Sequence, residues 1–331
     1  MESFTAFLEK RVTQVDSLLC IGLDPHRGDL TEFSAQAAGA FCTRLIEATA
    51  DIAAAYKPNA AFFEALGPEG IVALQSVIAA VPDGIPVLLD AKRGDIASTA
   101  EAYADAVYRV LGADAVTLSP YLGRDSIEPF IADPKQGVFL LCKTSNPGAS
   151  DLQDLEVIDS SGTAPQRLYE HIATLAQTWN AHHNLGLVVG ATQVESLDNV
   201  RAAAPDLWFL TPGIGAQGGD LRAALRAGLR ADGLGMLIPV SRAIARADDP
   251  RETALALRSQ INMEREEIMA SKESPGSASA LTGDQSQLAD ALLDAGCIQF
   301  GNFTLRSGLE SPIYIDLRRL ASYPKLLSQA A

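Results

Sequence analysis

Eight short apolar runs, each followed by a segment with helical periodicity, constrain the fold of this chain more than any other feature. Their apolar character is nearly continuous, which is typical of parallel strands covered on both faces. Strands with one face in water would instead alternate between apolar and polar residues. The runs are Leu18–Asp24, Ala54–Asn59, Pro86–Lys92, Asp114–Ser119, Gly137–Lys143, Gly186–Gly190, Leu207–Thr211 and Leu234–Val240.

Helical periodicity fills the intervals between the runs, and an amphipathic helix is predicted before the first run, over Glu2–Val15. Eight strands, each followed by a helix, are the count expected of a closed (β/α)8 or TIM barrel. We therefore predict an α/β fold of this kind, with an open doubly wound sheet as the alternative. The predicted helices cover residues 33–52, 68–81, 96–112, 124–132, 164–184, 193–204, 220–231 and 243–270.

Composition limits the partners of such a protein. Of the 331 residues, 47% are hydrophobic and 20% are charged, so the chain can bury a large core. The formal net charge of −15 argues against binding to nucleic acid or to an anionic membrane, because both need clustered Lys and Arg. An anionic metabolite can still bind where one cleft is locally positive, so a phosphate site must be local.

The sequence also predicts a cytoplasmic location. The first residues lack a basic end followed by an apolar run, and no apolar stretch reaches the ~18 residues that a membrane span needs. The four cysteines form no C-x-x-C pair, so we expect reduced, buried thiols. The four histidines show no metal-ligand spacing, so we predict no metal site.

Polar residues collect where the predicted strands end. Barrel enzymes place their sites on the loops that follow the carboxyl ends of the strands, so these residues are the candidates for the chemistry. They are Asp24, Lys57 with Asn59, Asp90 with Lys92, Ser119, Lys143 with Ser145, Gln217, and Ser241 with Arg242.

The third run ends in the densest group of charges. Residues two apart in a strand point the same way, so Asp90 and Lys92 face one cavity, while Asp95 belongs to the next turn. Lys57 can join them across the barrel mouth. Such an array keeps a lysine charged in a cleft, where it can protonate a carbanion beside a carboxylate that repels a substrate carboxylate. It suits decarboxylation without a cofactor; a salt-bridge network that only closes the barrel is the alternative.

A glycine-rich loop, Thr211–Asp220, follows the seventh run. Gly213, Gly215 and Gly218 match the dinucleotide pattern G-x-G-x-x-G, but that pattern normally opens the first βαβ unit of a domain. The loops after strands seven and eight of a barrel instead recurrently bind phosphate, and Arg242 adds a charged fork. We predict a phosphate site, with a nicotinamide site or plain tight turns as alternatives.

Ser145 lies in the segment Lys143–Gly148, directly after the fifth run. Its hydroxyl can bond a polar heterocycle, or it can only cap its own backbone in a turn. Spacing alone does not decide between these two interpretations.

With these residues identified, the chain resembles orotidine 5′-phosphate decarboxylase over residues 1–270. The resemblance rests on six motifs in order: GLDP, YKPN, DAKRGDIAST, SNPG, PGIGAQGGD and PVSRAI. It implies conversion of orotidine 5′-phosphate to uridine 5′-phosphate and CO2, the last step of UMP biosynthesis, with no cofactor. Lys92 would protonate C6 of the pyrimidine, Asp90 would press on the departing carboxylate, and Lys57 and Asp24 would hold the ribose hydroxyls.

The resemblance further implies a homodimer with shared active sites. In that assembly Asp95 and Thr99 would reach into the site of the neighbouring subunit. The other positions that it assigns to the small-molecule nucleotide substrate are Ser145 at the pyrimidine, Gln217 and Arg242 at the phosphate, and Pro212 and Ser241 with them.

Past residue 270 the composition changes. Residues 271–283 are rich in Ser, Gly and Ala, which predicts a flexible linker. Helical periodicity over Gln285–Ala295 and alternating strands around Ser307-Gly308 predict a small α+β appendage over 284–331. The run FGNFTLRSGLESPIYIDLR resembles the opening of an orotate phosphoribosyltransferase, with Arg306 facing ligand. The strand and Thr-Thr-Gly loop that grip phosphoribosyl pyrophosphate in that family do not occur in the sequence, so we expect a truncated segment without transferase activity.

Two alternatives to the decarboxylase remain. A metal-dependent relative sharing the D-x-K-x-x-D strand would act on sugar phosphates as a keto-acid decarboxylase or synthase. It is expected to place a carboxylate ligand where this chain has Lys57-Pro-Asn59. The other alternative is a non-catalytic assembly partner, which would not need charged residues on so many strand ends.

Overall fold

The computed structural model describes residues 2–158, 165–214, 220–273, 291–293, 295–304, 310–316 and 323. The chain divides into two compact units, Met1–Ala270 and Ser271–Ala331. Each unit is described by itself. Within the described residues, no helix combines the length and the apolar character needed to cross a membrane.

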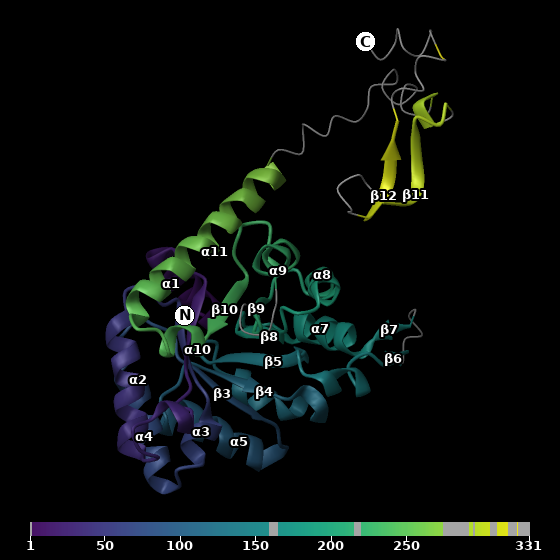
Figure 1. The fold of residues 1–331 in the computed structure, drawn as a ribbon. Coiled ribbons are helices and arrows are strands. Elements are labelled where there is room, and N and C mark those ends of the chain that lie inside the picture. Colours follow the sequence, from purple (N-terminus) through teal and green to yellow (C-terminus); the bar gives the residue numbers. More distant parts are fainter. Residues whose placement is uncertain are drawn as a thin grey trace. The chain divides into compact units, whose positions relative to one another are not determined.

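The first unit is a parallel eight-stranded barrel surrounded by helices (Figure 1). Its strands follow the order β2-β1-β10-β9-β8-β5-β4-β3. Two isolated parallel bridges, Tyr56↔Val87 and Asn59↔Asp90, join β2 to β3 and close the ring. The predicted TIM barrel is therefore confirmed. The strands are β1 (Leu19–Leu23), β2 (Ala55–Pro58), β3 (Leu88–Arg93), β4 (Ala115–Leu118), β5 (Gly137–Lys143), β8 (Leu185–Val189), β9 (Trp208–Leu210) and β10 (Met236–Val240).

Helices alternate with these strands and cover the outside of the barrel (Figure 1). They pack through apolar faces, and helix α7, for example, buries Tyr169, Ala173 and Ala176 at helical spacing. The helices are α1 (Phe4–Val15), α2 (Ala35–Thr49), α3 (Ala60–Glu64), α4 (Pro68–Ala79), α5 (Ala97–Asp105), α6 (Glu128–Ile131), α7 (Leu168–Trp179), α8 (Val194–Ala203), α9 (Leu221–Gly228), α10 (Arg242–Ala245) and α11 (Pro250–Glu273).

The N-terminal helix α1 covers the end of the barrel at which the strands begin. Ser3 caps it by accepting a hydrogen bond from the Ala6 amide. Its buried residue Phe4 meets the ring of Phe139 edge-on at 6.2 Å between centroids. A side chain at Gly137, the first residue of β5, would clash with the Phe4 ring. The opposite end, where the strands finish, stays open for a site.

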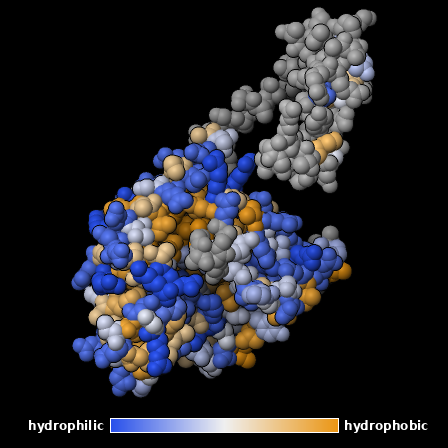
Figure 2. Space-filling view, viewed as in Figure 1, coloured by the Kyte–Doolittle hydropathy of each residue, from blue (hydrophilic) through white to orange (hydrophobic). Residues whose placement is uncertain are grey.

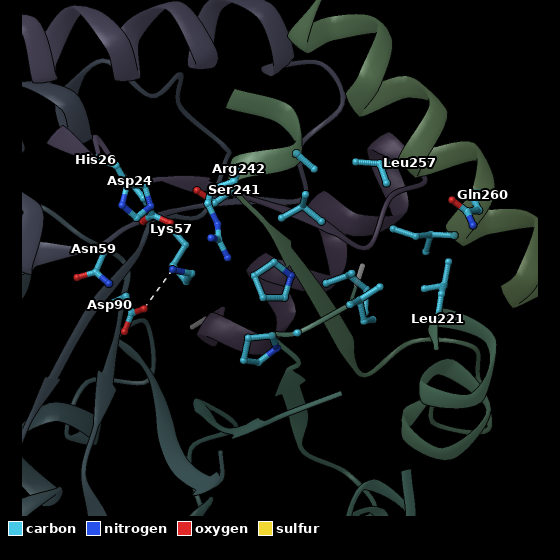
Figure 3. Close-up of a pocket in the computed structure, with 18 of the residues that line it drawn as sticks. Asp24, His26, Lys57, Asn59, Asp90, Leu221, Ser241, Arg242, Leu257 and Gln260 are labelled. Atoms are coloured by element: carbon cyan, nitrogen blue, oxygen red, sulfur yellow. Dashed lines mark hydrogen bonds and ion pairs between the residues drawn. The ribbon is translucent and has the colours of Figure 1, made fainter. Parts of the chain in front are cut away.

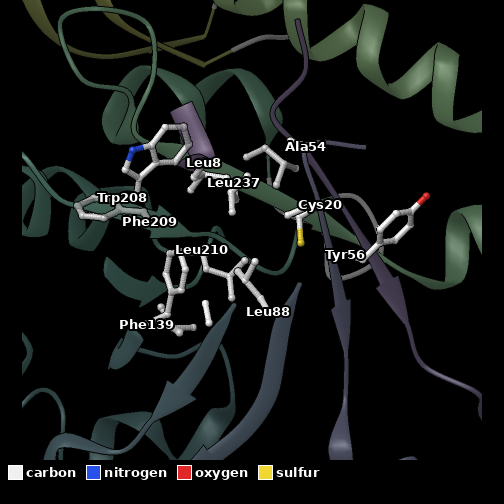
Figure 4. Packing of buried hydrophobic residues seen from close by; sticks show 14 of the residues in the cluster. Leu8, Cys20, Ala54, Tyr56, Leu88, Phe139, Trp208, Phe209, Leu210 and Leu237 are labelled. Atoms are coloured by element: carbon white, nitrogen blue, oxygen red, sulfur yellow. The ribbon is translucent and has the colours of Figure 1, made fainter. Parts of the chain in front are cut away.

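The barrel interior is packed with large apolar side chains from neighbouring strands (Figure 4). Trp208 and Phe209 are consecutive in β9 and point to opposite faces of the sheet, so Phe209 packs outside the barrel against Arg201 of α8. Both rings, like that of Phe139 of β5, are nearly inaccessible to solvent. All four cysteines are free and buried, which confirms the expectation of inert, reduced thiols. Burial raises the pKa of the Cys20 thiol to about 12, so it carries no charge at neutral pH.

Three predicted helices differ from the structure. The segment predicted as a helix from residue 164 first forms a short strand, β7 (Gln166–Arg167), which pairs with β6 (Glu156–Val157). The helix predicted over 96–112 changes at Ala106–Val110 into one π-helical turn. The helix predicted over 243–270 is broken before α11, because Pro250 starts a new helix and cannot continue the preceding one.

The described part of the second unit is an antiparallel hairpin of β11 (Ile298–Thr304) and β12 (Glu310–Ile315), in which Phe300 pairs with Ile313. This agrees with the predicted hairpin, although its turn at Ser307-Gly308 and Arg306 lie outside the described residues. Helix α11 runs to Glu273, past the predicted start of the linker, and residues 274–283 are likewise outside the described part. Most of Gln285–Ala295, predicted as helical, is also not described.

Candidate active site

A cavity of about 640 Å³ lies at the end of the barrel where the strands finish. Figure 3 shows Asp24, Lys57 and Asp90 together on one side of it, with Leu221, Leu257 and Gln260 on the other. Figure 2 shows the apolar surface between α9 and α11 on that second side. The predicted site residues that line the cavity are Asp24, Lys57, Asp90, Pro212, Ser241 and Arg242.

Asp90 links two lysines through its two carboxylate oxygens. Lys57 Nζ lies 3.1 Å from Oδ2, and Lys92 Nζ lies 2.5 Å from Oδ1. The Lys57 and Asp90 side chains are only 10% and 12% exposed, whereas Lys92 is 49% exposed. Lys57 therefore lines the cavity as a largely buried ammonium bound to Asp90, and Lys92 is the more exposed ammonium on the other oxygen of the same carboxylate. The structure brings together the three residues of the predicted array.

Both buried members of the array are charged at neutral pH. Burial alone would lower the pKa of Lys57, but the carboxylates of Asp24 and Asp90 outweigh burial and raise it. Burial alone would raise the pKa of Asp90, but Lys57 and Lys92 outweigh burial and hold it at about 2. A second carboxylate placed beside Asp90 would therefore meet a fixed negative charge.

The backbone at Lys92 is strained. Its φ of 47° lies in the left-handed region, which a residue with a long side chain seldom adopts. Such a conformation costs about 1–3 kcal/mol and persists where the surrounding structure enforces it, often at functional sites. The strained backbone conformation is therefore that of Lys92, the exposed lysine of the array.

Asp24 and Ser241 offer polar atoms that lack a partner within the described part of the chain. Asp24 Oδ1 and Ser241 Oγ are buried without a hydrogen bond there, and both residues line the cavity. Gly22 permits this arrangement, because a Cβ at this position would lie 2.6 Å from Ser241 Cβ. Buried polar atoms in native proteins are normally hydrogen-bonded, so these two suit a ligand rich in hydroxyl groups.

The far wall of the cavity offers a cation for an anionic group. Arg242 begins α10 after β10, and its side chain is exposed. Among the described residues, no carboxylate forms an ion pair with it, so its guanidinium can receive an oxyanion. Pro212 and Gly213 line the same region, and Gly213 has a φ of 106° that favours glycine. Gln217, predicted to contact phosphate, lies outside the described residues.

Four predicted residues do not line the cavity in the part of the chain that the structure describes, and one of them is Lys92, which contacts the cavity residue Asp90. Asp95 lies in the turn after β3, where its Oδ1 accepts a hydrogen bond from the Ile96 amide at 2.8 Å. Thr99 is exposed on α5. Ser145 follows β5 and packs near Gly190, where an added Cβ would lie 3.1 Å from the Ser145 Cβ.

The loop that carries Ser145 is fixed by a buried ion pair. Lys143, at the end of β5, has a side chain only 1% exposed, and its Nζ lies 2.6 Å from Asp154 Oδ1. The Thr144 amide donates to Gln153 Oε1 at 2.9 Å. These contacts connect the two ends of the loop. The Lys143 ammonium therefore supports the loop and is not free to bind a ligand.

Several residues of the cavity were not singled out by the sequence analysis, among them His26 and Phe62. His26 follows the GLDP motif, and its ring meets that of Phe62 from α3 at 4.3 Å between centroids. Both line the cavity near Asp24. The position of His26 two residues after Asp24 was a usable signal, whereas Phe62 sits in a helical segment with no distinguishing pattern.

Known proteins resemble this chain over the whole barrel. The family described as "Orotidine 5'-phosphate decarboxylase / HUMPS family" matches residues 17–257. The chain is 46% identical over 272 residues to the orotidine 5′-phosphate decarboxylase of Roseiflexus castenholzii, covering 81% of this chain and 98% of the relative.

Solved structures also resemble this chain over the barrel. The OMP decarboxylase of Leishmania donovani has a TM-score of 0.73 at 55% identity, covering 80% of this chain and 99% of that one. The UMP synthase of Leishmania donovani has a TM-score of 0.74 at 53% identity, covering 99% of this chain and 68% of that one. The chain belongs to the orotidine 5′-phosphate decarboxylase / HUMPS family.

Proposed function

We propose that this protein converts orotidine 5′-phosphate to uridine 5′-phosphate and CO2 without a metal or an organic cofactor. The observation that carries the proposal is the array in which Asp90, a residue of the cavity, binds both Lys57 and Lys92. In a member of this family, that array supplies an acid and a repelling carboxylate side by side. The names of the relatives support the same reaction.

Each member of the array has a distinct task. The bond between C6 and the carboxylate carbon breaks, CO2 leaves, and the electron pair stays on C6. Lys92 donates a proton from its ammonium to C6, and water returns a proton to the amine. Asp90 destabilises the substrate carboxylate by repulsion, and this repulsion disappears as CO2 forms. Lys57 keeps Asp90 ionised throughout.

The remaining site residues are proposed to hold the nucleotide. Asp24 Oδ1 and Lys57 suit the ribose hydroxyls, and Ser241 lies beside them. Arg242 and Pro212 line the cavity and suit the phosphate, and Gln217 is proposed to contact the same group. Ser145 is proposed to bond the pyrimidine.

We further propose a homodimer with shared active sites. In this proposal Asp95 and Thr99, which do not line the described cavity of their own barrel, serve the site of the neighbouring subunit. Large apolar side chains are exposed along the same edge: Ile96 is 52% and Tyr121 83% exposed. They follow β3 and β4, and pairing this edge with a second copy would cover them.

For the rest of the chain we propose a linker within residues 271–283 that begins after helix α11 ends at Glu273, and 284–331 as a segment related to the opening of an orotate phosphoribosyltransferase. The similarity to a UMP synthase over 99% of this chain supports a relationship that extends past the barrel. No transferase activity is proposed. We propose a cytoplasmic location, to which the four free cysteines are suited.

The first test is a spectrophotometric assay of orotidine 5′-phosphate loss, with and without a chelator. We expect equal turnover in both, because the Lys57 ammonium stands among the acidic groups where a divalent cation would otherwise bind. Loss of activity with the chelator would favour the metal-dependent sugar-phosphate enzyme. No turnover under either condition would favour an assembly partner.

The phosphate role of Arg242 is tested separately by replacing it with alanine. Uridine 5′-phosphate should bind about tenfold to a hundredfold more weakly, as expected for a lost charged hydrogen bond, whereas uridine should bind as before. Calorimetry with both ligands measures the difference. Arg246→Ala is the matched control, because Arg246 pairs with Asp29 at 2.9 Å instead of lining the cavity. Equal weakening for both ligands would contradict the assignment.

A further inference from the structure

Strand β3 carries a bulge at the catalytic array. Leu89 pairs with Val116 of β4, and Arg93 pairs with Leu118. Asp90, Ala91 and Lys92 therefore stand opposite the single residue Thr117. In a regular parallel ladder the amides of successive residues would alternate between backbone acceptors on the two neighbouring strands. The bulge interrupts this regular backbone hydrogen bonding at Asp90 and Lys92, the two residues that the proposed reaction uses.

The hydroxyl of Thr117 takes the place of the missing ladder. Thr117 is buried, with 1% of its surface exposed. Its Oγ1 accepts hydrogen bonds from the amides of Ala91 at 3.1 Å and Lys92 at 2.9 Å, and donates its own proton to Asp90 Oδ1 at 3.0 Å. A hydroxyl has one proton and two lone pairs, so all of its capacity is used. The Asp90 oxygen that it contacts is also the one bound by Lys92.

We propose that Thr117 is a positioning residue for the decarboxylation: its hydroxyl fixes the left-handed backbone of Lys92 and the carboxylate of Asp90 in position relative to each other. This inference rests on the proposed function and deepens it. Thr117 is not placed at the reacting atoms, because its hydroxyl is buried and fully used by its bonds to Ala91, Lys92 and Asp90. It acts on the two residues that do the chemistry.

Valine tests the hydroxyl most directly, because it keeps the shape of threonine and removes only the hydrogen bonds. In Thr117→Val, the partly buried amides of Ala91 and Lys92 lose their acceptor, which is unfavourable. The strand can recover those bonds by relaxing its bulge, and a shift of register turns strand side chains to the other face. Lys92 would then no longer be held beside Asp90.

The experiment compares Thr117→Val, Thr117→Ser and Thr49→Val. Thr49 is also buried, and its hydroxyl bonds Leu45 and Tyr56 away from the cavity, so Thr49→Val reproduces the loss of a buried hydroxyl. Calorimetry with uridine 5′-phosphate counts the competent sites, and kcat is expressed per site. We expect kcat of Thr117→Val to fall about tenfold to a hundredfold, as for a misplaced catalytic group, with KM nearly unchanged. Thr117→Ser and Thr49→Val should keep near-parental kcat.

Hydrogen exchange gives a second readout that does not depend on activity. In Thr117→Val the amides of Ala91 and Lys92 should exchange faster, while in Thr117→Ser they should stay protected. Parental kcat and protection in Thr117→Val would overturn the inference, as would an equal loss of kcat in Thr49→Val. If the parent protein does not decarboxylate orotidine 5′-phosphate, the proposed function is wrong. If the parent is active but the amides of Ala91 and Lys92 exchange no faster in Thr117→Val, only the proposed role of Thr117 is wrong.

Discussion

Replacing Lys92 with alanine is expected to abolish turnover while nucleotide binding survives. The ammonium delivers its proton after the substrate has bound, so its loss falls on kcat. We expect a fall of about 10³-fold or more, because a positioned general acid commonly contributes 10²–10⁴-fold. Lys57 still pairs with Asp90 in this variant, so the buried charge is not left alone. Steady-state kinetics and calorimetry with uridine 5′-phosphate measure the two effects.

Lys135→Ala is the matched control for this variant. Lys135 is an exposed lysine just before β5, at the end of the barrel opposite to the cavity, and its removal should leave kcat and binding at parental values. Turnover by Lys92→Ala comparable to that of Lys135→Ala would refute the role of Lys92 as proton donor. A loss of binding equal to the loss of turnover would instead make Lys92 a binding residue.

Two inactive variants should restore activity when they share one dimer. Asp95→Asn is expected to lower turnover by at least about 10²-fold, as for other lost charges that stabilise a transition state. In a mixed dimer of Lys92→Ala and Asp95→Asn, one site combines the intact Lys92 of one chain with the intact Asp95 of the other. Such a dimer should show about half of parental turnover, because one of its two symmetric sites is complete.

Co-expression with two different affinity tags, followed by tandem purification, isolates the mixed dimer. The two homodimers purified in parallel give the background. Activity no higher than that background would show that Asp95 does not complete the neighbour's site. A parental rate for the Asp95→Asn homodimer would remove Asp95 from the catalytic machinery altogether.

The architecture was predictable because parallel barrel strands are buried on both faces. Each apolar run identified its strand within about two residues, the usual error at element ends, and parallel topology then carried polar residues from distant positions to one edge. Lys57, Asp90 and Lys92 meet for that reason. The short β6–β7 hairpin was missed because two-residue strands leave no periodicity to detect.

The local geometry of the site was not predictable. Alternation placed Asp90 and Lys92 on one face, but the bulge and the positive φ of Lys92 depend on a contact with Thr117 on another strand. In the sequence Thr117 is one polar residue in an apolar run. Only the fold shows that its hydroxyl holds both neighbours. Likewise, the difference in exposure between Lys57 and Lys92 follows from their depth in the barrel and not from their residue type.

The seam between β2 and β3 closes the barrel through only two isolated bridges, and one of them joins Asn59 to Asp90. The ion pair of Lys57 and Asp90 spans the same seam. The contacts that close the barrel between β2 and β3 therefore also hold the charged groups proposed for catalysis in their relative positions. Nucleotide binding to Asp24 and Lys57 should therefore stabilise the joint between β2 and β3, so that occupancy of the site and the stability of the fold rise together.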